Sequence, residues 1–261
     1  MTDTMLFRKE GPVGHVIFNN PARHNAVSLE MWEAAAAMLA DCEKDPEIRV
    51  VVVSGAGGKA FVSGADISKF GSERATQEAV ATYNAATERL YGTLHAFPKP
   101  TIAMIRGYCI GGGFGLAASC DIRIATPQSR FAVPAAKLGL GYDYAGLIRI
   151  VGIIGPAFAK EIFFTARQFD AEETRQMGFL NRIVPDAEIE AYVRGYADMI
   201  AGNAPLTIAA AKFAVGEALK DESQRDVARA RALVRACFDS ADYVEGRTAF
   251  LEKRKPVFTG S

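Results

Sequence analysis

The chain has 261 residues, of which 49% are hydrophobic, 10% aromatic and 23% charged, and this composition excludes disordered, collagen-like and small disulfide-stapled chains. Thirty Lys and Arg residues balance thirty Asp and Glu residues, so no overall positive field is available to hold nucleic acid or an anionic membrane surface. The length fits one large folded unit, or one unit with an appendage.

Cysteine and histidine usage predicts neither disulfides nor a metal site. No apolar signal-peptide core follows the first ten residues, and no CxxC pair is present, so a cytoplasmic location is expected. The three histidines are far apart and lack the spacing of metal ligands. The longest apolar region, residues 138–159, carries Asp143 and Arg149, which argues against a membrane span. The four scattered cysteines are Cys42, Cys109, Cys120 and Cys237.

Strand and helix patterns alternate in the first half of the chain. Residues 13–18 predict a strand, and Ser28 is placed to cap a helix that runs to about Glu43. The valine run within residues 49–54 is typical of a strand buried on both faces of a largely parallel sheet. We therefore expect an α/β fold.

Shorter elements follow, and the patterns become almost entirely helical after residue 157. We expect a turn at 63–66, a helix at 77–96, a strand at 101–106, a small-residue helix ending near 119, and strands at 121–125 and 130–133. The later helices are predicted at 157–165, 171–177, 187–202, 205–219, 223–238 and 243–253.

The densest motif is GYCIGGGFG at residues 107–115, with five glycines where a strand leads into a helix. Residues 113–118 satisfy GxGxxA, but no acidic residue follows at the distance that a dinucleotide ribose requires, so a dinucleotide site is disfavoured. Two explanations remain from the residues alone. The free N–H groups of a helix start can stabilise an anion, or the glycines can serve only close helix–strand packing.

Three segments together resemble the crotonase superfamily of enoyl-CoA hydratases and isomerases: KAFVSGADI at 59–67, IGGGFG at 110–115 and CDIRIA at 120–125. Residues 20–28, 177–184 and 249–256 support the resemblance, which spans essentially the whole chain. It implies a crotonase (ClpP/crotonase-like) spiral of ββα units, with residues 1–200 forming the core and acyl-CoA pocket. Residues 201–261 would form a helical region of the same unit that builds a homotrimer or homohexamer. The implied ligand is an acyl-CoA substrate, with no cofactor beyond its CoA moiety.

The same resemblance assigns site residues by position. The backbone N–H groups of Ala65 and Gly112 would form an oxyanion hole, in which hydrogen-bond donors stabilise negative charge on the thioester oxygen. The CoA contacts implied are Arg23, the backbone of Ala26, the loop residues Ser63, Gly64, Asp66 and Ile67, together with Gly111, Lys255 and Phe258.

Both glutamates that position and activate water in hydratases are replaced. Their positions hold Gly115 and Ala135, and neither side chain can transfer a proton. Hydration of an enoyl-CoA by the usual two-glutamate route is therefore not expected.

Two neighbouring residues offer competing chemistry. Tyr142 matches a tyrosine of methylmalonyl-CoA decarboxylase, and within the superfamily the chain most resembles members like this enzyme. Asp143 matches the functional aspartate of dienoyl-CoA isomerases and of 4-chlorobenzoyl-CoA dehalogenase. If neither residue takes part in catalysis, Tyr142 would simply pack in the pocket and Asp143 would cap a following helix.

These matches lead to one expected reaction and several alternatives. Decarboxylation of a malonyl-type CoA ester comes first, because loss of CO2 creates the enolate without a general base. Tyr142 would orient the departing carboxylate, and Asp143 or water would deliver the proton. The alternatives are an enoyl- or dienoyl-CoA isomerase, an acyl-CoA hydrolase or dehalogenase that uses Asp143, and a catalytically silent protein that only binds acyl-CoA.

Overall fold

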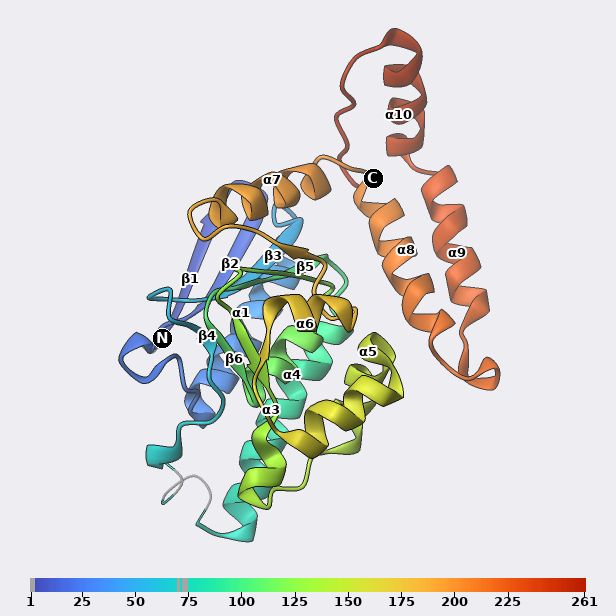
Figure 1. Ribbon diagram of the computed structural model, residues 1–261. Coiled ribbons are helices and arrows are strands. Elements are labelled where there is room, and N and C mark those ends of the chain that lie inside the picture. The colour runs from blue at the N-terminus through green and yellow to red at the C-terminus, as the bar shows by residue number, and fades with distance from the viewer. Residues whose placement is uncertain (1–2, 70, 72–74) are drawn as a thin grey trace.

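The computed structural model describes residues 3–69, 71 and 75–261, and the strands in it form two sheets (Figure 1). The six-stranded sheet contains, in spatial order, β1 (Met5–Glu10), β2 (Val13–Phe18), β3 (Val50–Gly55), β5 (Thr101–Ile105), β7 (Ile122–Ala125) and β10 (Arg182–Ile183). The four-stranded sheet contains β4 (Ala60–Val62), β6 (Tyr108–Ile110), β8 (Arg130–Ala132) and β9 (Phe169–Asp170). Only the β1–β2 and β8–β9 pairs among these strands are antiparallel.

The earlier α-helices pack around the two sheets, and the last three project away from them. They are α1 (Leu29–Lys44), α3 (Gln77–His95), α4 (Gly112–Ala118), α5 (Tyr144–Thr165), α6 (Ala171–Gln176), α7 (Ile189–Ala201), α8 (Pro205–Ala218), α9 (Val227–Phe238) and α10 (Ala241–Glu252). Short 3₁₀ turns lie at Pro21–Arg23, Ile67–Lys69, Pro134–Leu138 and Glu222–Gln224. Among the described residues, no single helix is long and apolar enough to cross a bilayer; α7 and α8 meet both criteria only as a pair, across a bend of 102°.

A ββα unit repeats along the chain. In successive units, β3 and β4 precede α3, β5 and β6 precede α4, and β7 and β8 precede α5. The first strand of each unit joins the six-stranded sheet and the second joins the four-stranded sheet. Because each unit adds a parallel neighbour to both sheets, the chain winds as a spiral, and the expected α/β spiral of ββα units is confirmed.

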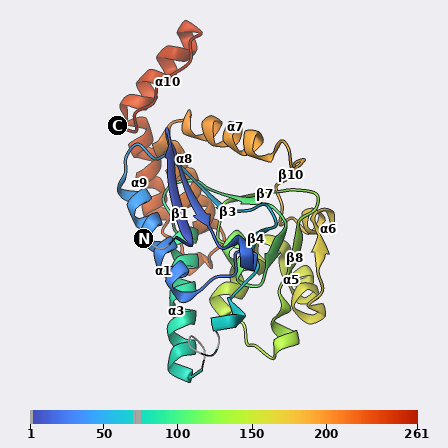
Figure 2. The ribbon, with the colours of Figure 1, turned by 90° about the vertical axis from the view of Figure 1, so that its left-hand side faces the viewer.

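The valine run of β3 packs against helices on both faces of the large sheet. Val50 and Val52 enter a core with α7 on one face of the large sheet, whereas Val51 and Val53 enter the main core on the other face. Figure 2 shows α7 lying across one side of this sheet, with α1 and α3 on the opposite side. Burial on both faces, as predicted, therefore makes β3 the centre of three layers.

Parallel pairing also fixes where the loops that follow β4 and β6 lie. These two strands are neighbours in the small sheet, with Ala60 opposite Tyr108 and Val62 opposite Cys109. Since parallel strands end at the same edge, residues 63–66 and 111–112 emerge side by side. Both loops of the resemblance motifs consequently meet at one edge of the small sheet.

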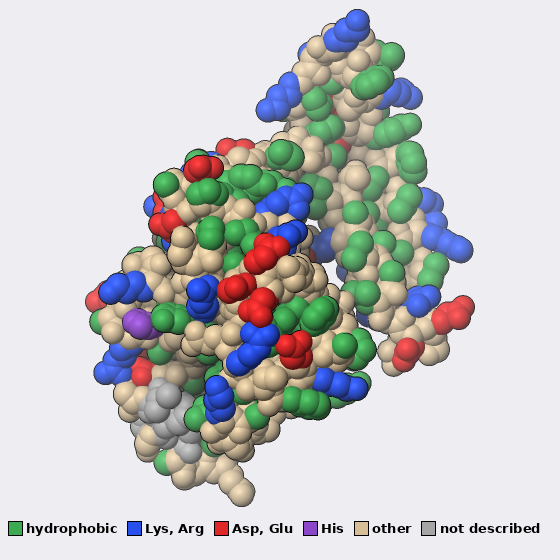
Figure 3. Space-filling view, viewed as in Figure 1, with side chains coloured by type: hydrophobic (Ala, Val, Ile, Leu, Met, Phe, Trp, Pro, Cys, Tyr) green, Lys and Arg blue, Asp and Glu red, His purple; other side chains and the backbone are tan. Residues whose placement is uncertain are grey.

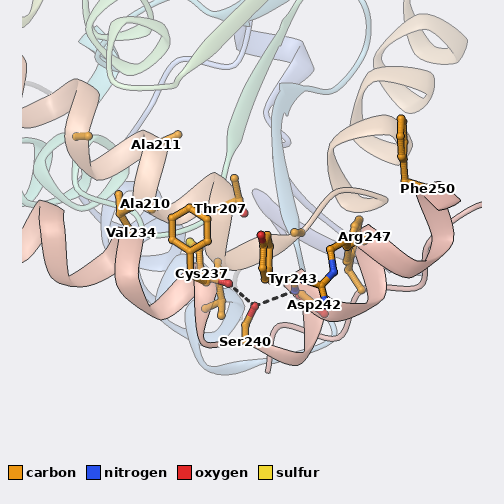
Figure 4. Close-up of a pocket in the computed structure, with 16 residues that line it drawn as sticks. Thr207, Ala210, Ala211, Val234, Cys237, Ser240, Asp242, Tyr243, Arg247 and Phe250 are labelled. Carbon is orange, nitrogen blue, oxygen red and sulfur yellow. Dashed lines mark hydrogen bonds between the residues drawn. The ribbon is translucent and has the colours of Figure 1, made fainter.

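The last three helices form an arm that projects from the two sheets (Figure 1). Helices α8 and α9 pack against each other, and α10 extends beyond them. Between them lies an apolar groove of about 720 Å³, where the Ser240 hydroxyl donates to the Cys237 carbonyl and accepts from the N–H of Tyr243 (Figure 4). Figure 3 shows hydrophobic side chains gathered along this arm. Phe250 and Leu251 are 84% and 75% exposed.

The structure contains elements that the sequence did not predict, among them the short strands β4, β9 and β10. Strand β1 was not predicted, because Met5 is its only fully buried residue and no alternating pattern results. Strand β6 lies inside the glycine-rich motif that we had taken as a connection. Helix α5 begins at Tyr144, after Asp143 as expected if that residue is a cap, and continues through the stretch predicted as a separate helix at 157–165. The non-helical Gly155 before Pro156 interrupts it.

Asp143 begins α5 by accepting a hydrogen bond of 2.9 Å from the N–H of Ala145. We expect Asp143→Ala to lower the free energy of unfolding by about 1 kcal/mol, because alanine cannot accept this bond. Asp143→Asn keeps an acceptor and is the matched control, with a stability close to that of the wild type. Urea denaturation measures both, and equal stability of the two variants would contradict the capping role.

Candidate functional site

The loops after β4 and β6 come into direct contact. Gly64 has φ of +104°, a conformation open to glycine. A Cβ atom at residue 64 would lie 3.3 Å from the carbonyl oxygen of Ile110 and 3.8 Å from the backbone nitrogen of Gly112. The backbone beside Ala65 is therefore within a few ångströms of the Gly112 nitrogen.

A parallel bridge between Val27 and Ala65 sets the direction of the Ala65 N–H. The N–H of Val27 donates to the carbonyl of Gly64 at 2.8 Å, and the carbonyl of Val27 accepts from the N–H of Asp66 at 3.0 Å. In such a bridge the groups of Ala65 itself point away from Val27. Within the described chain, the Ala65 N–H donates no hydrogen bond.

Gly112 is the first residue of α4, so its N–H has no partner within the helix. The preceding Gly111, with φ of +56°, donates its own N–H to the carbonyl of Ala132 at 2.8 Å and holds the turn. No described group accepts a bond from the N–H of Gly112. The structure thus brings the two N–H groups that the sequence assigned to an oxyanion hole onto adjacent segments.

One turn along α4, two tyrosines fill the space beside Gly115. A Cβ atom at this position would lie 2.9 Å from Cε2 of Tyr91 and 3.0 Å from the hydroxyl of Tyr142. The ring of Tyr142 also packs edge-on against Phe163 and closely against Gly146. A glutamate at position 115 would have to displace both tyrosine rings, so the volume that a carboxylate would need is occupied by phenols.

Burial keeps both phenols neutral. It raises the pKa of Tyr142 to about 12, although the Arg149 cation opposes the shift. Burial, together with the neighbouring Tyr142, also raises the pKa of Tyr91 well above its ordinary value. The Tyr142 hydroxyl makes no hydrogen bond to the described residues, yet it is not among their fully buried unsatisfied atoms. This hydroxyl is therefore not engaged by the described part of the chain.

A nearby carboxylate, Glu88, is already paired. Its Oε2 accepts a hydrogen bond of 2.6 Å from Arg149, whose guanidinium lies 5.8 Å from the ring centre of Tyr91. Ala135, at the second hydratase position, packs half-buried against the core. The exposed Asp143 uses its carboxylate to cap α5. None of these three residues offers an unengaged, buried carboxylate to the pocket.

The predicted CoA-binding loop is held by a charge pair. The Arg23 guanidinium contacts both carboxylate oxygens of Asp66 at 3.1 Å and also donates to the hydroxyl of Ser68. Burial opposes ionisation of Asp66, but the hydrogen bonds from Ser68 and the Arg23 charge outweigh it and hold the pKa of the carboxyl below its usual value. Arg23 is thus poised at the rim of the loop, with its side chain about half exposed.

The other predicted contacts of this loop lie close to Arg23. The N–H of Ala26 and the hydroxyl of Ser63 both donate to the carbonyl of Arg23. Ile67 starts the 3₁₀ turn after Asp66, and its side chain lies outside the described part of the structure.

Lys255 and Phe258 lie elsewhere. The carbonyl of Phe258 accepts a hydrogen bond from Arg49, which precedes β3 and therefore sits at the end of the strands opposite the hole. Lys255 is exposed on the same tail. Within one chain, the structure does not bring these two residues to the oxyanion hole.

Sequence reasoning missed the side chains that wall the hole. Trp32, the pair Tyr83 and Tyr91, and Arg149 come from three different helices, and each fits an ordinary amphipathic helix, so no local pattern could single them out. The described residues contain no cluster of His, Cys, Asp and Glu that could hold a metal ion.

Comparisons with known proteins agree with this geometry. Residues 8–261 match the family model for enoyl-CoA hydratase/isomerase. A short-chain-enoyl-CoA hydratase from Clostridium acetobutylicum is 32% identical over 97% of this chain and 96% of its own length. A carnitinyl-CoA dehydratase from Citrobacter koseri is also 32% identical, over the full length of both chains.

Among solved structures, an enoyl-CoA hydratase/carnithine racemase from Magnetospirillum magneticum superposes with a TM-score of 0.93 at 36% identity. It covers all of this chain and 97% of its own. None of the relatives named here is a decarboxylase, so the particular resemblance to methylmalonyl-CoA decarboxylase that we drew from the sequence is not supported. The chain belongs to the enoyl-CoA hydratase/isomerase family.

Proposed function

We propose that this protein is an acyl-CoA lyase that holds the thioester oxygen of its substrate between the N–H groups of Ala65 and Gly112. The observation that carries the proposal is the pair of N–H groups without partners in the described chain, on two segments in contact. A thioester oxygen gains negative charge when an enolate forms, and fixed donors stabilise that charge more than they stabilise the neutral ground state. One such donor contributes about 2.7–4 kcal/mol in a comparable hydrolase.

Tyr142 is the group we assign to proton delivery. With a pKa of about 12, its phenol stays protonated at neutral pH and acts as a hydrogen-bond and proton donor rather than as a base. Because of this raised pKa, the protonated form is lost only as the pH rises through about 12. Asp143 has a structural role in this proposal, because its carboxylate is engaged at the start of α5.

Two reactions fit an enolate held in this way. Addition of water is favoured by the named relatives, a hydratase and a dehydratase. Water would add to the β-carbon of an enoyl-CoA, the enolate would take a proton at its α-carbon from Tyr142, and the proton that the added water loses would restore the phenol. Removal of water is the reverse of this sequence. Decarboxylation of a malonyl-type CoA ester is favoured by one observation only: phenols fill the space beside Gly115 and position 135 is alanine, so no carboxylate base is present at either place. The relatives give decarboxylation no support, and we keep it as the second candidate.

A panel of CoA esters in D2O tests the proposal. Malonyl-, methylmalonyl-, crotonyl-, 3-hydroxybutyryl-, dienoyl- and aryl-CoA would be incubated with the enzyme and analysed by mass spectrometry. We expect turnover of at least one malonyl-type, crotonyl- or 3-hydroxybutyryl-CoA ester. Decarboxylation or hydration would place deuterium on the carbon next to the thioester, because the enolate takes its proton from solvent-exchanged groups, whereas dehydration would remove a proton from that carbon.

Crotonyl- or 3-hydroxybutyryl-CoA as the substrate would select the hydro-lyase, and a malonyl-type ester would select the decarboxylase. Tyr142→Phe should slow turnover by about 10²-fold, the lower end of the effect of a general acid. Hydrolysis of the thioester without deuterium in the acyl group, or binding of every ester without turnover, would overturn the proposal.

We further propose that the protein assembles as a homotrimer or homohexamer through its α8–α10 arm. The exposed Phe250 and Leu251, together with the apolar groove beside α10, form a surface that a monomer would leave in water. Lys255 and Phe258, which are remote from the hole of their own chain, could then contact CoA bound to a neighbouring copy.

Sedimentation velocity checks the assembly. We expect a species of three or six times the 28.0 kDa of one chain at micromolar concentration. Phe250→Glu should shift the distribution towards smaller species, because it places a charge on the apolar surface. A wild-type protein that sediments at 28.0 kDa would contradict the assembly proposal.

A further inference from the structure

Three buried aromatic side chains connect the two halves of the hole from behind. Trp32, Tyr83 and Tyr91, here called the aromatic clamp, are 1%, 3% and 5% exposed. We propose that the aromatic clamp is a positioning device that holds the N–H groups of Ala65 and Gly112 at a fixed separation. This inference rests on the function proposed above and adds the residues that set the geometry of the hole.

Tyr83 secures the Ala65 side. The indole N–H of Trp32 donates to the hydroxyl of Tyr83 at 2.8 Å, and that hydroxyl donates to the carbonyl of Val27 at 3.0 Å. Val27 is the residue that pairs with Ala65 in the parallel bridge. The position of the bridge, and with it the direction of the Ala65 N–H, therefore depends on the Tyr83 hydroxyl.

Tyr91 secures the Gly112 side. Its hydroxyl donates to the carbonyl of Gly112 at 2.5 Å, although α4 already offers this carbonyl an internal partner. The indole of Trp32 fills the space above the Cα of Gly112, where a Cβ atom would lie 3.3 Å from its Cζ2. Together these contacts fix the orientation of residue 112, whose N–H forms the other half of the hole.

A single helix carries both tyrosines. They are eight residues apart on α3, so they lie on the same face, about 12 Å apart along the axis. Trp32 of α1 lies between them, hydrogen-bonded to Tyr83 and edge-on to Tyr91 with ring centres 5.7 Å apart. Because Trp32 and the face of α3 that carries both tyrosines are buried in the main core, the two segments cannot separate without disrupting this packing.

The hydroxyls of Tyr83 and Tyr91 show that the aromatic clamp makes polar contacts as well as apolar ones. Phenylalanine would fill nearly the same volume and would not need a buried hydrogen-bond partner. Each hydroxyl instead contacts backbone at the hole: one reaches the carbonyl of Val27 and the other that of Gly112. Small displacements of catalytic donors reduce rates strongly, so a loss of either hydroxyl should weaken the stabilisation of the enolate.

The test uses acetoacetyl-CoA, a ligand that reports on the hole whatever the natural reaction is. The carbon between its two carbonyl groups is acidic, and the enolate formed there absorbs in the near ultraviolet. Bound next to two N–H donors, the ligand should form its enolate at a lower pH than it does free in water. The measured quantity is the pH at which half of the bound ligand is enolate, in the wild type, Tyr91→Phe and Tyr83→Phe.

We expect each variant to raise this pH by about one unit, a tenfold loss of enolate stabilisation, with the affinity for free CoA unchanged. Tyr196→Phe is the matched control: Tyr196 is a half-buried tyrosine of α7, on the far face of the large sheet, and the variant should behave as the wild type. A general loss of structure would lower CoA affinity as well, whereas loss of positioning affects only the enolate.

The outcomes separate the clamp from the proposed function. If wild-type protein binds acetoacetyl-CoA without lowering the pH of its enolisation, the oxyanion hole itself is wrong. If the wild type lowers it and both variants do so equally well, the hole stands and the clamp is overturned. Trp32 is the only tryptophan of the chain, so its fluorescence during denaturation verifies folding at this site. If one variant does not fold, the other decides the question.

Discussion

The parallel bridge between Val27 and Ala65 is the constraint on which the rest of the site depends. By using the backbone groups on either side of Ala65, it leaves the N–H of Ala65 without an acceptor among the residues that the structure describes. The ββα spiral makes this arrangement possible, because the parallel strands β4 and β6 deliver their following loops to the same edge. A buried backbone N–H without a hydrogen-bond partner normally lowers the stability of a fold. In the function we propose, one ligand oxygen would accept hydrogen bonds from both of these N–H groups.

The chemistry of the pocket follows from what surrounds that pair. Two neutral phenols occupy the space beside Gly115, and the carboxylate of the nearby Glu88 forms an ion pair with Arg149. In the function we propose, such a pocket would stabilise a developing oxyanion and supply a proton, but its described residues offer no free carboxylate to remove one. This distinguishes the protein, within the enoyl-CoA hydratase/isomerase family, from the two-glutamate arrangement that the sequence resemblance implies for hydratases.

Local pattern and motif accounted for much of the fold. Ser28 as a helix cap and the double-sided burial of the β3 valines follow from side-chain chemistry and spacing, and the structure has both. Strand β6 could not be foreseen, because three residues within a glycine run carry too little pattern.

The site could be predicted only where backbone chemistry is local. Ala65 and Gly112 were assigned as donors through the family resemblance of residues 59–67 and 110–115, and this assignment stays a prediction. Trp32, Tyr83 and Tyr91 act through hydrogen bonds between positions about fifty residues apart or to another segment's backbone, and only the folded chain brings these together.

The central claim is that the N–H groups of Ala65 and Gly112 bind the thioester oxygen. Its most direct test is the infrared band of a thioester carbonyl, isotopically labelled with ¹³C in crotonyl-CoA, bound to the protein. Gly112→Pro removes the N–H, whereas Gly112→Ala keeps it while adding a side chain near Trp32. We predict that the wild type and the alanine variant shift the band below its frequency in water, and that the proline variant loses most of the shift. An unshifted band in the wild type, or an equal shift in the proline variant, would contradict the account.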